Sequence, residues 1–449
     1  MRRSTLLPAT LLALGCHDEE CDPDDPNSCG DGQVCEVSAD GTPACFAPLL
    51  VEGRVFNLSD GEGIERARVV ALDANSAPRS RVATSDTDGL YSLQVPAERD
   101  EDGAPVGTTL TLRADAAGYL TFPSGARLPF PVDTSGAVEG DDAWVLASTT
   151  TDIGLIVAPV GTGTGSIQGV ADVPAAPVGI LVVAEGEGRA VTAIADLDGA
   201  FTIFNLSAGD YSVRGYGQGV SYDAVPAEVS ADETTEVALH LGDTATGSVS
   251  GTLQIVNAPG GSRTSVILVV EATFDEDLAR GETPPGLRAA GVSSAFDIEG
   301  VPAGRYVVLA AFENDLLVRD PDTSIGGTQI QHVEVAAGGT ATAEGFKITE
   351  ALAVLGPGAS EPEAVSASVT LSWVDDSSED LYEVRVVDAY GNEVWSTDEA
   401  SHSGDDPAVP YEGPLEPGMY YQFRATSLKD GVPISTTEDL LGVFWVPAE

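Results

Sequence analysis

The sequence predicts an all-β protein built from tandem β-sandwich domains that follow a small disulfide-rich N-terminal segment. Turn-forming residues are abundant, since 50 glycines and 28 prolines make up about one residue in six. Hydrophobic residues still account for 43% of the 449 residues, which is enough apolar material for packed cores. Short apolar segments between frequent turns are typical of β-strands, and a chain of this length divides into roughly three to five domains.

Residues 1–15 have the features of a secretory leader. Arg2 and Arg3 precede an apolar run from Leu6 to Leu14, which is too short to cross a membrane. A small residue then precedes Cys16, and the sequence Leu-Ala-Leu-Gly-Cys resembles the lipobox of bacterial lipoproteins. The resemblance implies that the Cys16 thiol is linked to diacylglycerol and that this lipid attaches the protein to the membrane. The alternative is ordinary secretion, with Cys16 free or disulfide-bonded.

Four more cysteines lie in the segment 16–48, which we expect to form a Cys-rich tether; they are Cys21, Cys29, Cys35 and Cys45. An even set in an oxidising compartment predicts two disulfides. Four cysteines allow three pairings, and the sequence does not choose among them. Our working expectation is the interleaved pairing of Cys21–Cys35 with Cys29–Cys45. A zinc site is the weaker alternative, because thiolate sites favour close CxxC pairs and five, seven or nine residues separate neighbours here.

A degenerate internal repeat divides the next part of the chain into three units, 49–160, 161–244 and 245–350. Each unit contains an apolar strand, and these are ARVVAL (67–72), GILVVA (179–184) and SVILVVEA (265–272). Each also contains a hairpin-like stretch, and these are TSDTDGLYSLQVP (84–96), IADLDGAFTIFNLSAGDYSV (194–213) and VSSAFDIEGVPAGRYVV (292–308). Apolar and polar residues alternate in YSLQV and FTI, as half-buried strands require.

These units resemble the carboxypeptidase regulatory-like family, whose members are small sandwiches related to transthyretin. The residues of the first unit that match the family pattern are Gly53, Ala67, Val69, Asp86, Gly89, Tyr91 and Leu93. The third unit departs most, because Ser-Ser-Ala replaces the Asp-x-Asp-Gly turn. The resemblance implies Ig-like, transthyretin-like sandwiches that act as non-catalytic accessories.

The last unit, 365–449, resembles the fibronectin type III pattern. Leu415, Pro417 and Tyr421 match the tyrosine corner of that fold, and Trp373 matches its buried strand-B tryptophan. We expect the Gly-, Pro- and Glu-containing segment 351–364 to be a linker. The glycine-rich stretch 161–165 is expected to be another.

No catalytic constellation is found, so the sequence predicts no enzyme, no catalytic residue and no cofactor. The histidines occupy four different segments, and the HExxH and GxSxG motifs are absent; the histidines are His17, His240, His332 and His402. The Asp86–Asp88 and Asp196–Asp198 pairs resemble part of a calcium loop, but no bidentate glutamate follows at the required position. We interpret both pairs as hairpin turns and predict no metal site.

The chain carries 71 acidic residues against 21 lysines and arginines, a formal net charge of −50. A nucleic-acid partner and a purely electrostatic attachment to anionic lipid are therefore not expected, because both need a cationic face. A large negative charge keeps a protein soluble and makes its copies repel one another in a crowded exterior, and we interpret the composition in this way. Binding of a divalent cation is the alternative.

Together these features predict an exported, lipid-anchored, non-catalytic protein of the cell envelope. His17 follows Cys16, which favours the outer membrane or cell surface by the sorting pattern of bacterial lipoproteins. We expect the modules to form a rod of ~100–120 Å for adhesion, interaction or spacing. The first alternative is a polysaccharide-binding accessory that uses exposed aromatics such as Trp144, Trp395 or Tyr222. The second is an inert spacer in a complex with an envelope protein.

Overall fold

The computed structural model describes residues 21–22, 28–30, 32–123, 128–159, 163–174, 179–256, 263–276, 280–311, 330–366, 368–376, 379–400 and 406–448. The chain is all-β, as predicted: its regular elements in these ranges are strands and two short 3-10 helices, η1 (Thr134–Gly136) and η2 (Glu271–Thr273). Within the same ranges, no helix is long and apolar enough to span a membrane.

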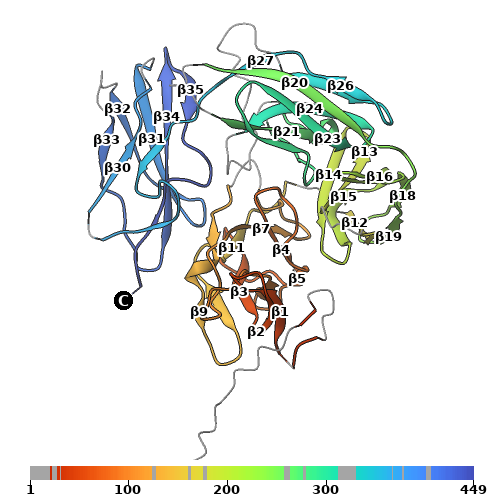
Figure 1. The fold of residues 1–449 in the computed structure, drawn as a ribbon, viewed down its shortest axis with the longest axis horizontal. Coiled ribbons are helices and arrows are strands. Elements are labelled where there is room, and N and C mark those ends of the chain that lie inside the picture. Colours follow the sequence, from red (N-terminus) through yellow and green to blue (C-terminus); the bar gives the residue numbers. More distant parts are fainter. Residues whose placement is uncertain are drawn as a thin grey trace, which may run out of the picture.

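The strands form a small N-terminal hairpin and four two-sheet sandwiches (Figure 1). The hairpin pairs β1 (Val34–Val37) with β2 (Pro43–Phe46). In the first sandwich, one sheet contains β3 (Leu49–Asn57), β6 (Leu90–Val95), β9 (Val138–Glu139), β10 (Trp144–Ala147) and β11 (Ile153–Leu155). The facing sheet contains β4 (Arg68–Leu72), β5 (Ala83–Thr84), β7 (Thr109–Asp115) and β8 (Val132–Asp133).

The second and third sandwiches follow a similar plan. The sheets of the second are β12 (Thr164–Ala171), β15 (Ala200–Ser207) and β19 (Thr234–Leu239), and β13 (Ile180–Gly186), β14 (Arg189–Ala195), β16 (Gly209–Gly217), β17 (Val220–Ser221) and β18 (Val225–Val229). The sheets of the third are β20 (Gly247–Val256), β23 (Ala295–Val301), β26 (Thr340–Thr342) and β27 (Phe346–Thr349), and β21 (Thr264–Val270), β22 (Arg288–Val292), β24 (Gly304–Ala311) and β25 (Gln331–Val335).

The fourth sandwich has different sheets. One contains β28 (Val354–Gly356), β30 (Val369–Trp373) and β33 (Ala408–Tyr411). The other contains β29 (Glu363–Ala364), β31 (Leu381–Asp388), β32 (Glu393–Ala400), β34 (Tyr420–Lys429), β35 (Val432–Thr436) and β36 (Val443–Trp445). The segment 351–364, expected to be a linker, therefore contributes two short strands to this sandwich. Its Leu352 and Val354 are buried in the core, which the proline and glycine content of the segment obscured.

The three repeated units share a pairing pattern around their first strand. β3, β12 and β20 each pair antiparallel with one hairpin strand and parallel with later strands. In each unit a glycine of the first strand lies opposite an aromatic residue, and the pairs are Gly53–Tyr91, Gly169–Phe201 and Gly251–Phe296. A Cβ on these glycines would come within 2.9, 3.0 and 2.6 Å of the opposite side chain. The glycine and aromatic positions of the repeat are thus two halves of one packing contact.

The second expected linker is only partly described. Thr164 begins β12, so the C-terminal end of the glycine-rich stretch is a strand rather than a linker. Gly163 adopts φ +87°, a left-handed conformation that glycine allows at low cost just before the strand. Gly161 and Thr162 lie outside the described residues.

The sandwiches do not form a rod, and the expected extended shape is wrong. In Figure 1 the first sandwich lies at the bottom and the third sandwich lies above it. The fourth sandwich is on the left of this pair and the second is on the right. Arg81 pairs with Asp198 of the second sandwich at 2.6 Å. Arg288 of the third sandwich donates to the Ala74 carbonyl at 2.8 Å. The Thr149 hydroxyl donates to the Gly418 carbonyl of the fourth sandwich at 3.1 Å. The first sandwich therefore contacts all three others.

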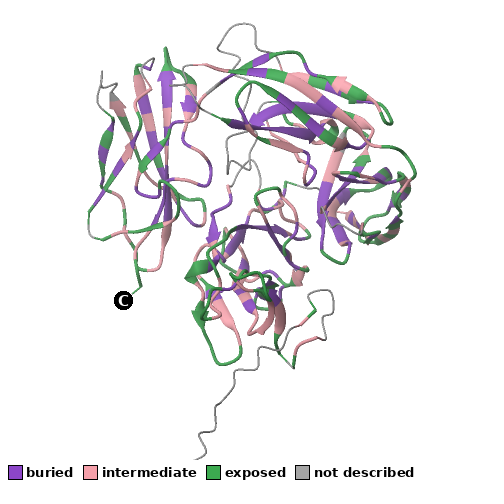
Figure 2. Ribbon diagram, in the orientation of Figure 1, coloured by how far each residue is buried: buried purple, intermediate pink, exposed green. Residues whose placement is uncertain are grey.

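The physical reason is that several strands are apolar on both faces. In β4, Val69 and Ala71 lie in the core of the first sandwich, whereas Val70 and Leu72 belong to a different apolar cluster. That cluster also contains the core of the third sandwich and four residues of the second, which are Leu181, Val183, Ile194 and Tyr216. Figure 2 shows buried residues on strands of all three sandwiches. A rod would leave part of this surface in water.

A buried polar group lies where the first three sandwiches meet, a contact that we call the junction. The guanidinium of Arg113 on β7 is 3.1 Å from a Glu282 carboxylate oxygen of the third sandwich and donates to the Thr192 hydroxyl of the second at 3.1 Å. Thr192 in turn donates to Glu282 at 3.1 Å. Burial lowers the pKa of Arg113, but the carboxylates of Glu282 and Asp115 more than offset this and raise it. One side chain thus joins three sandwiches.

A second contact between sandwiches depends on one asparagine. Asn205, with φ +62°, donates to the carbonyls of Ala116 and Tyr119 at 3.2 and 2.8 Å. It also accepts the Gly118 N–H at 2.6 Å. A side chain of the second sandwich thereby completes a turn of the first. Asparagine suits this position because it tolerates a left-handed backbone and offers both donors and an acceptor.

Replacement of Arg113 tests whether the junction holds the three sandwiches together. The side chain of Arg113 is only 5% exposed, so Arg113→Met leaves Glu282 without this cationic partner. We expect a loss of about 2–3 kcal/mol, somewhat below the usual cost of breaking a fully buried pair, because Glu282 keeps some contact with water. In urea unfolding followed by circular dichroism, the midpoint should fall by about 1 M.

The matched control for this variant is Arg81→Gln, at an exposed ion pair between the first two sandwiches. It should change stability by less than about 0.5 kcal/mol, because exposed pairs contribute little. An Arg113→Met midpoint equal to that of the control would contradict the role of the junction.

Candidate functional site

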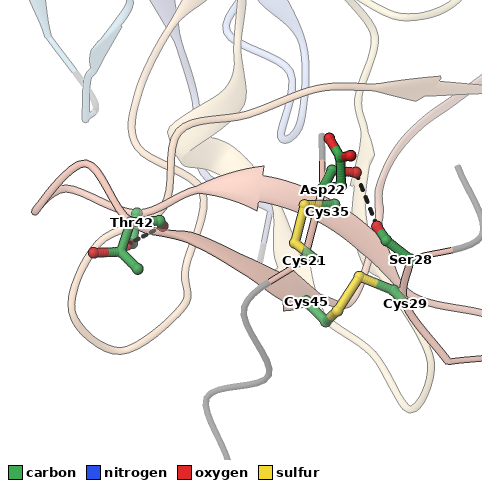
Figure 3. The surroundings of a disulfide bond; sticks show 8 residues. Cys21, Asp22, Ser28, Cys29, Cys35, Thr42 and Cys45 are labelled. Carbon is green, nitrogen blue, oxygen red and sulfur yellow. Dashed lines mark hydrogen bonds between the residues drawn. A yellow bond between two sulfur atoms is a disulfide. The ribbon is translucent and has the colours of Figure 1, made fainter. Parts of the chain in front are cut away.

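The first candidate site is the N-terminal clasp, which consists of Cys21, Cys29 and the β1–β2 hairpin. The structure has the interleaved pairing, with disulfides Cys21–Cys35 and Cys29–Cys45 at Cα–Cα distances of 5.8 and 5.6 Å (Figure 3). Cys35 and Cys45 lie directly opposite each other on β1 and β2. Each bonds to a cysteine of the preceding segment rather than to the other, and together they fix that segment on the hairpin.

The two disulfides lie close together. The sulfur atoms of Cys21, Cys29 and Cys45 are all within 4.8 Å of one another, and they are the one group of three or more potential metal-ligating residues found among the described residues. Each of these sulfurs already forms a disulfide, so none is a thiolate that could coordinate zinc. The arrangement is that of a two-bridge structural staple.

The clasp, which belongs to the segment expected to be a Cys-rich tether, is docked on the first sandwich. Glu36 on β1 and Arg99 of the first sandwich form an ion pair of 2.6 Å, with side chains 6% and 0% exposed. Arg99 also donates to the carbonyls of Ala47 and Gly103, at 2.9 and 3.3 Å. Its guanidinium lies 5.4 Å from the ring centroid of Phe46, within cation–π range.

Backbone contacts reinforce this docking. The Ala39 N–H donates to the Arg99 carbonyl at 2.7 Å, and the Arg99 N–H donates to the Val37 carbonyl at 3.2 Å. The Ala97 N–H donates to the second carboxylate oxygen of Glu36 at 3.0 Å. Burial raises the pKa of Glu36, while the charge and hydrogen bonds of Arg99 oppose that shift. The pair holds the clasp in one orientation as long as both partners are present.

The aspartate turns agree with their interpretation from the sequence. The Asp86 carboxylate accepts the N–H groups of Asp88 and Leu90, both at 2.9 Å, and so closes a hairpin turn. Asp196 accepts two N–H groups of its own turn in the same way. In the second sandwich this turn has a further use, because Asp196 also accepts the Val82 N–H of the first sandwich at 3.1 Å. The turns therefore serve folding and packing.

The aromatic residues considered for polysaccharide stacking are buried or half-buried. Tyr222 is 2% exposed, and its hydroxyl donates to the Asp172 carbonyl at 2.5 Å. Trp395 packs edge-on against Tyr411, with ring centroids 5.4 Å apart, and Trp144 packs against the core of the first sandwich. None of the three has the fully exposed ring that a stacking platform for sugars would offer.

The fourth sandwich shows the two features that its sequence pattern predicts. Trp373 is fully buried against Tyr382, with ring centroids 5.2 Å apart. Tyr421 is 1% exposed, and its hydroxyl accepts the Glu416 N–H at 2.9 Å, a bond back to the upstream backbone as in a tyrosine corner. This bond fixes the loop that contains Gly418.

That loop forms one half of a second candidate site, the joint between the first and fourth sandwiches. The Thr149 hydroxyl donates to the Gly418 carbonyl at 3.1 Å and accepts the Tyr420 N–H at 3.2 Å. Phe56 of the first sandwich meets Tyr390 of the fourth edge-to-face, with centroids 5.4 Å apart. A groove of about 900 Å³ adjoins the joint, and its lining residues include Glu52, Arg54, Leu90, Thr149, Asp152 and Gly418.

Several predicted residues cannot be placed, and several important ones were not predicted. Cys16, His17 and His402 lie outside the described residues. Arg113 and the outward apolar faces were not identified from the sequence. A signal for the faces was present, because ARVVAL and GILVVA are continuous apolar runs, which are typical of strands buried on both faces.

Comparison with solved structures finds matches of low similarity. The Bacillus anthracis TIE protein is 13% identical, with a TM-score of 0.16, and the match covers 85% of this chain and 66% of that one. The major pilin subunit BcpA of Bacillus cereus is 10% identical, with a TM-score of 0.18, over 67% of this chain and 99% of that one. A tetra-tandem repeat from the extending region of a large adhesion protein is 14% identical, with a TM-score of 0.14, over 87% of this chain and 98% of that one.

TM-scores this low carry no argument about function. No protein-family model matches the chain, and no curated protein sequence matches it. The resemblances to the lipobox, to the carboxypeptidase regulatory-like family and to fibronectin type III domains therefore stay predictions.

The docking of the clasp can be tested through its buried ion pair. Arg99→Met leaves the buried Glu36 without its cationic partner, which costs about 3–5 kcal/mol, whereas Glu36→Leu combined with Arg99→Met removes both charges and should cost far less. Hydrogen exchange at the Ala39 and Arg99 amides, whose acceptors are backbone carbonyls, should accelerate at least about a hundredfold in the single variant, and the double variant should recover most of the protection. Equal exchange in wild type and the single variant, with both disulfides intact, would show that the pair does not hold the clasp.

Proposed function

We propose that this protein is a non-catalytic, lipid-anchored protein of the cell surface, and that its sandwiches form a compact body rather than an extended rod. The observation that carries the proposal is the docked clasp. Cys21 follows Cys16 by a few residues, a span of at most about 18 Å. A lipid on Cys16 would therefore be close to a segment that is fixed on the first sandwich, and through it to the other three.

The histidines support a non-catalytic role. Among the described residues, His240 lies 3.2 Å from Asp172 on the second sandwich, and His332 lies 2.8 Å from Glu271 on the third. Both histidines are exposed, and each pairs with a carboxylate of its own sandwich. Such pairs are ordinary surface contacts, because a general base also needs a nucleophile or substrate atom within reach.

Among the partners considered, we favour an envelope protein over a polysaccharide. Tyr222 is buried and Trp144 and Trp395 are half-buried, so these three residues give the polysaccharide hypothesis little support. The inert-spacer hypothesis also loses support, because four sandwiches packed around one another reach less far than four placed end to end. A compact protein with a net charge of −50 close to the membrane fits interaction better than spacing.

The lipid attachment is tested by Cys16→Ser. Wild-type protein should partition into the detergent phase of a Triton X-114 extraction, because acyl chains contribute about 0.8 kcal/mol per buried methylene. The variant should move to the aqueous phase or accumulate with an uncleaved or miscleaved leader. The combined Cys21→Ser and Cys35→Ser replacement removes one disulfide but keeps the lipid, so this control should stay in the detergent phase. Firm membrane association of cleaved Cys16→Ser protein would overturn the lipid proposal.

A further inference from the structure

The four sandwiches differ in how they are held. The first three share one apolar cluster, to which the first contributes Val70 and Leu72 and the second contributes Leu181 and Val183. The buried Arg113 lies at the same contact. The described core of the fourth sandwich is instead a cluster of its own, without members from the other three. The first three therefore form one body, and the fourth is a separate unit joined to it.

The covalent link between these two units is very short. Ala351 packs against the cluster shared by the first three sandwiches, while the next residue, Leu352, is buried in the core of the fourth. On the side of the fourth sandwich, the Leu352 N–H donates to the Thr436 carbonyl at 3.1 Å. The Ser435 hydroxyl of the same sandwich donates to the Glu350 carbonyl, so this bond crosses the link and breaks when the link turns. Consecutive residues thus belong to two different cores, so a change in the backbone dihedrals at this point would turn the fourth sandwich as a rigid unit.

The joint provides a further contact, which includes two interactions. The first is the Thr149 hydroxyl, which bonds to the Gly418 carbonyl and the Tyr420 N–H. The second is the edge-to-face contact of Phe56 with Tyr390. Hydrogen bonds within the fourth sandwich hold both of its contacting loops in place. The tyrosine-corner bond fixes the loop of Gly418, and Asp388 accepts the Tyr390 N–H at 2.9 Å.

From this arrangement we propose that the fourth sandwich is a hinged arm, which turns at Ala351–Leu352 and closes on the first sandwich through the joint. Among the described residues, the fourth sandwich from Leu352 onward contributes none to the apolar cluster that binds the first three sandwiches. Gly418 of the arm lines the groove beside the joint together with Arg54 and Asp152 of the first sandwich. Movement of the arm therefore widens that groove on its Gly418 side, while the first sandwich keeps the rest of the lining in place. The hinge does not depend on the lipid attachment.

Single-molecule energy transfer tests the hinge on full-length Cys16→Ser protein, whose remaining native cysteines are disulfide-bonded. Labels at Asp141→Cys on the first sandwich and Glu412→Cys on the arm report the joint, and both positions are exposed. We expect a dominant closed population and a minor open one. Combining Thr149→Val with Tyr390→Ala should enlarge the open population at least about tenfold, because the hydroxyl bonds and the aromatic contact of the joint are both lost.

Two controls separate hinge motion from unfolding. Tyr390→Phe keeps the ring and should leave the closed population unchanged. Labels at Asp141→Cys and Glu334→Cys, on the first and third sandwiches, should report one unchanged distance in every variant. Equal distributions in wild type and the combined variant would overturn the hinge proposal. It would also be overturned if the open population grew only with protein concentration, since the arm would then exchange between two copies of the chain.

Discussion

The position of three sandwiches depends on one buried guanidinium. Arg113 belongs to the first sandwich, but its partners Thr192 and Glu282 lie 79 and 169 residues further along the chain. A charge that is almost fully buried is tolerated only where carboxylates and hydroxyls meet it, so its burial fixes the relative position of the surrounding elements. The apolar residues around it supply the driving force for association, and Arg113 restricts the geometry in which that association occurs.

The clasp extends the same principle to the N-terminal segment. Its disulfides hold Cys21 and Cys29 on a hairpin too small to have a core of its own. The hairpin is held on the first sandwich by the buried pair of Glu36 and Arg99. Covalent staples thus act within the clasp, and a paired charge acts between the clasp and the body. Both devices replace the hydrophobic area that a short segment cannot bury.

The sequence was sufficient for the parts of the fold that depend on local pattern. The strand class and the burial of Trp373 follow from periodicity and from motifs within one unit. The arrangement of units could not be predicted in this way. Asn205 and Arg113 look like ordinary surface residues of strands in the sequence, because the groups that satisfy them belong to other units and come together only in the folded chain.

The shared apolar cluster has a consequence for how such a chain could diverge. In a chain of independently folded domains, one domain can be deleted, duplicated or exchanged without destabilising its neighbours. Here an isolated second sandwich would carry Leu181, Val183 and Tyr216 into solvent, and its loss would uncover Val70 of the first. Recombination at the unit boundaries would therefore yield aggregation-prone fragments. The three repeats must be inherited together, although each still resembles a self-contained module.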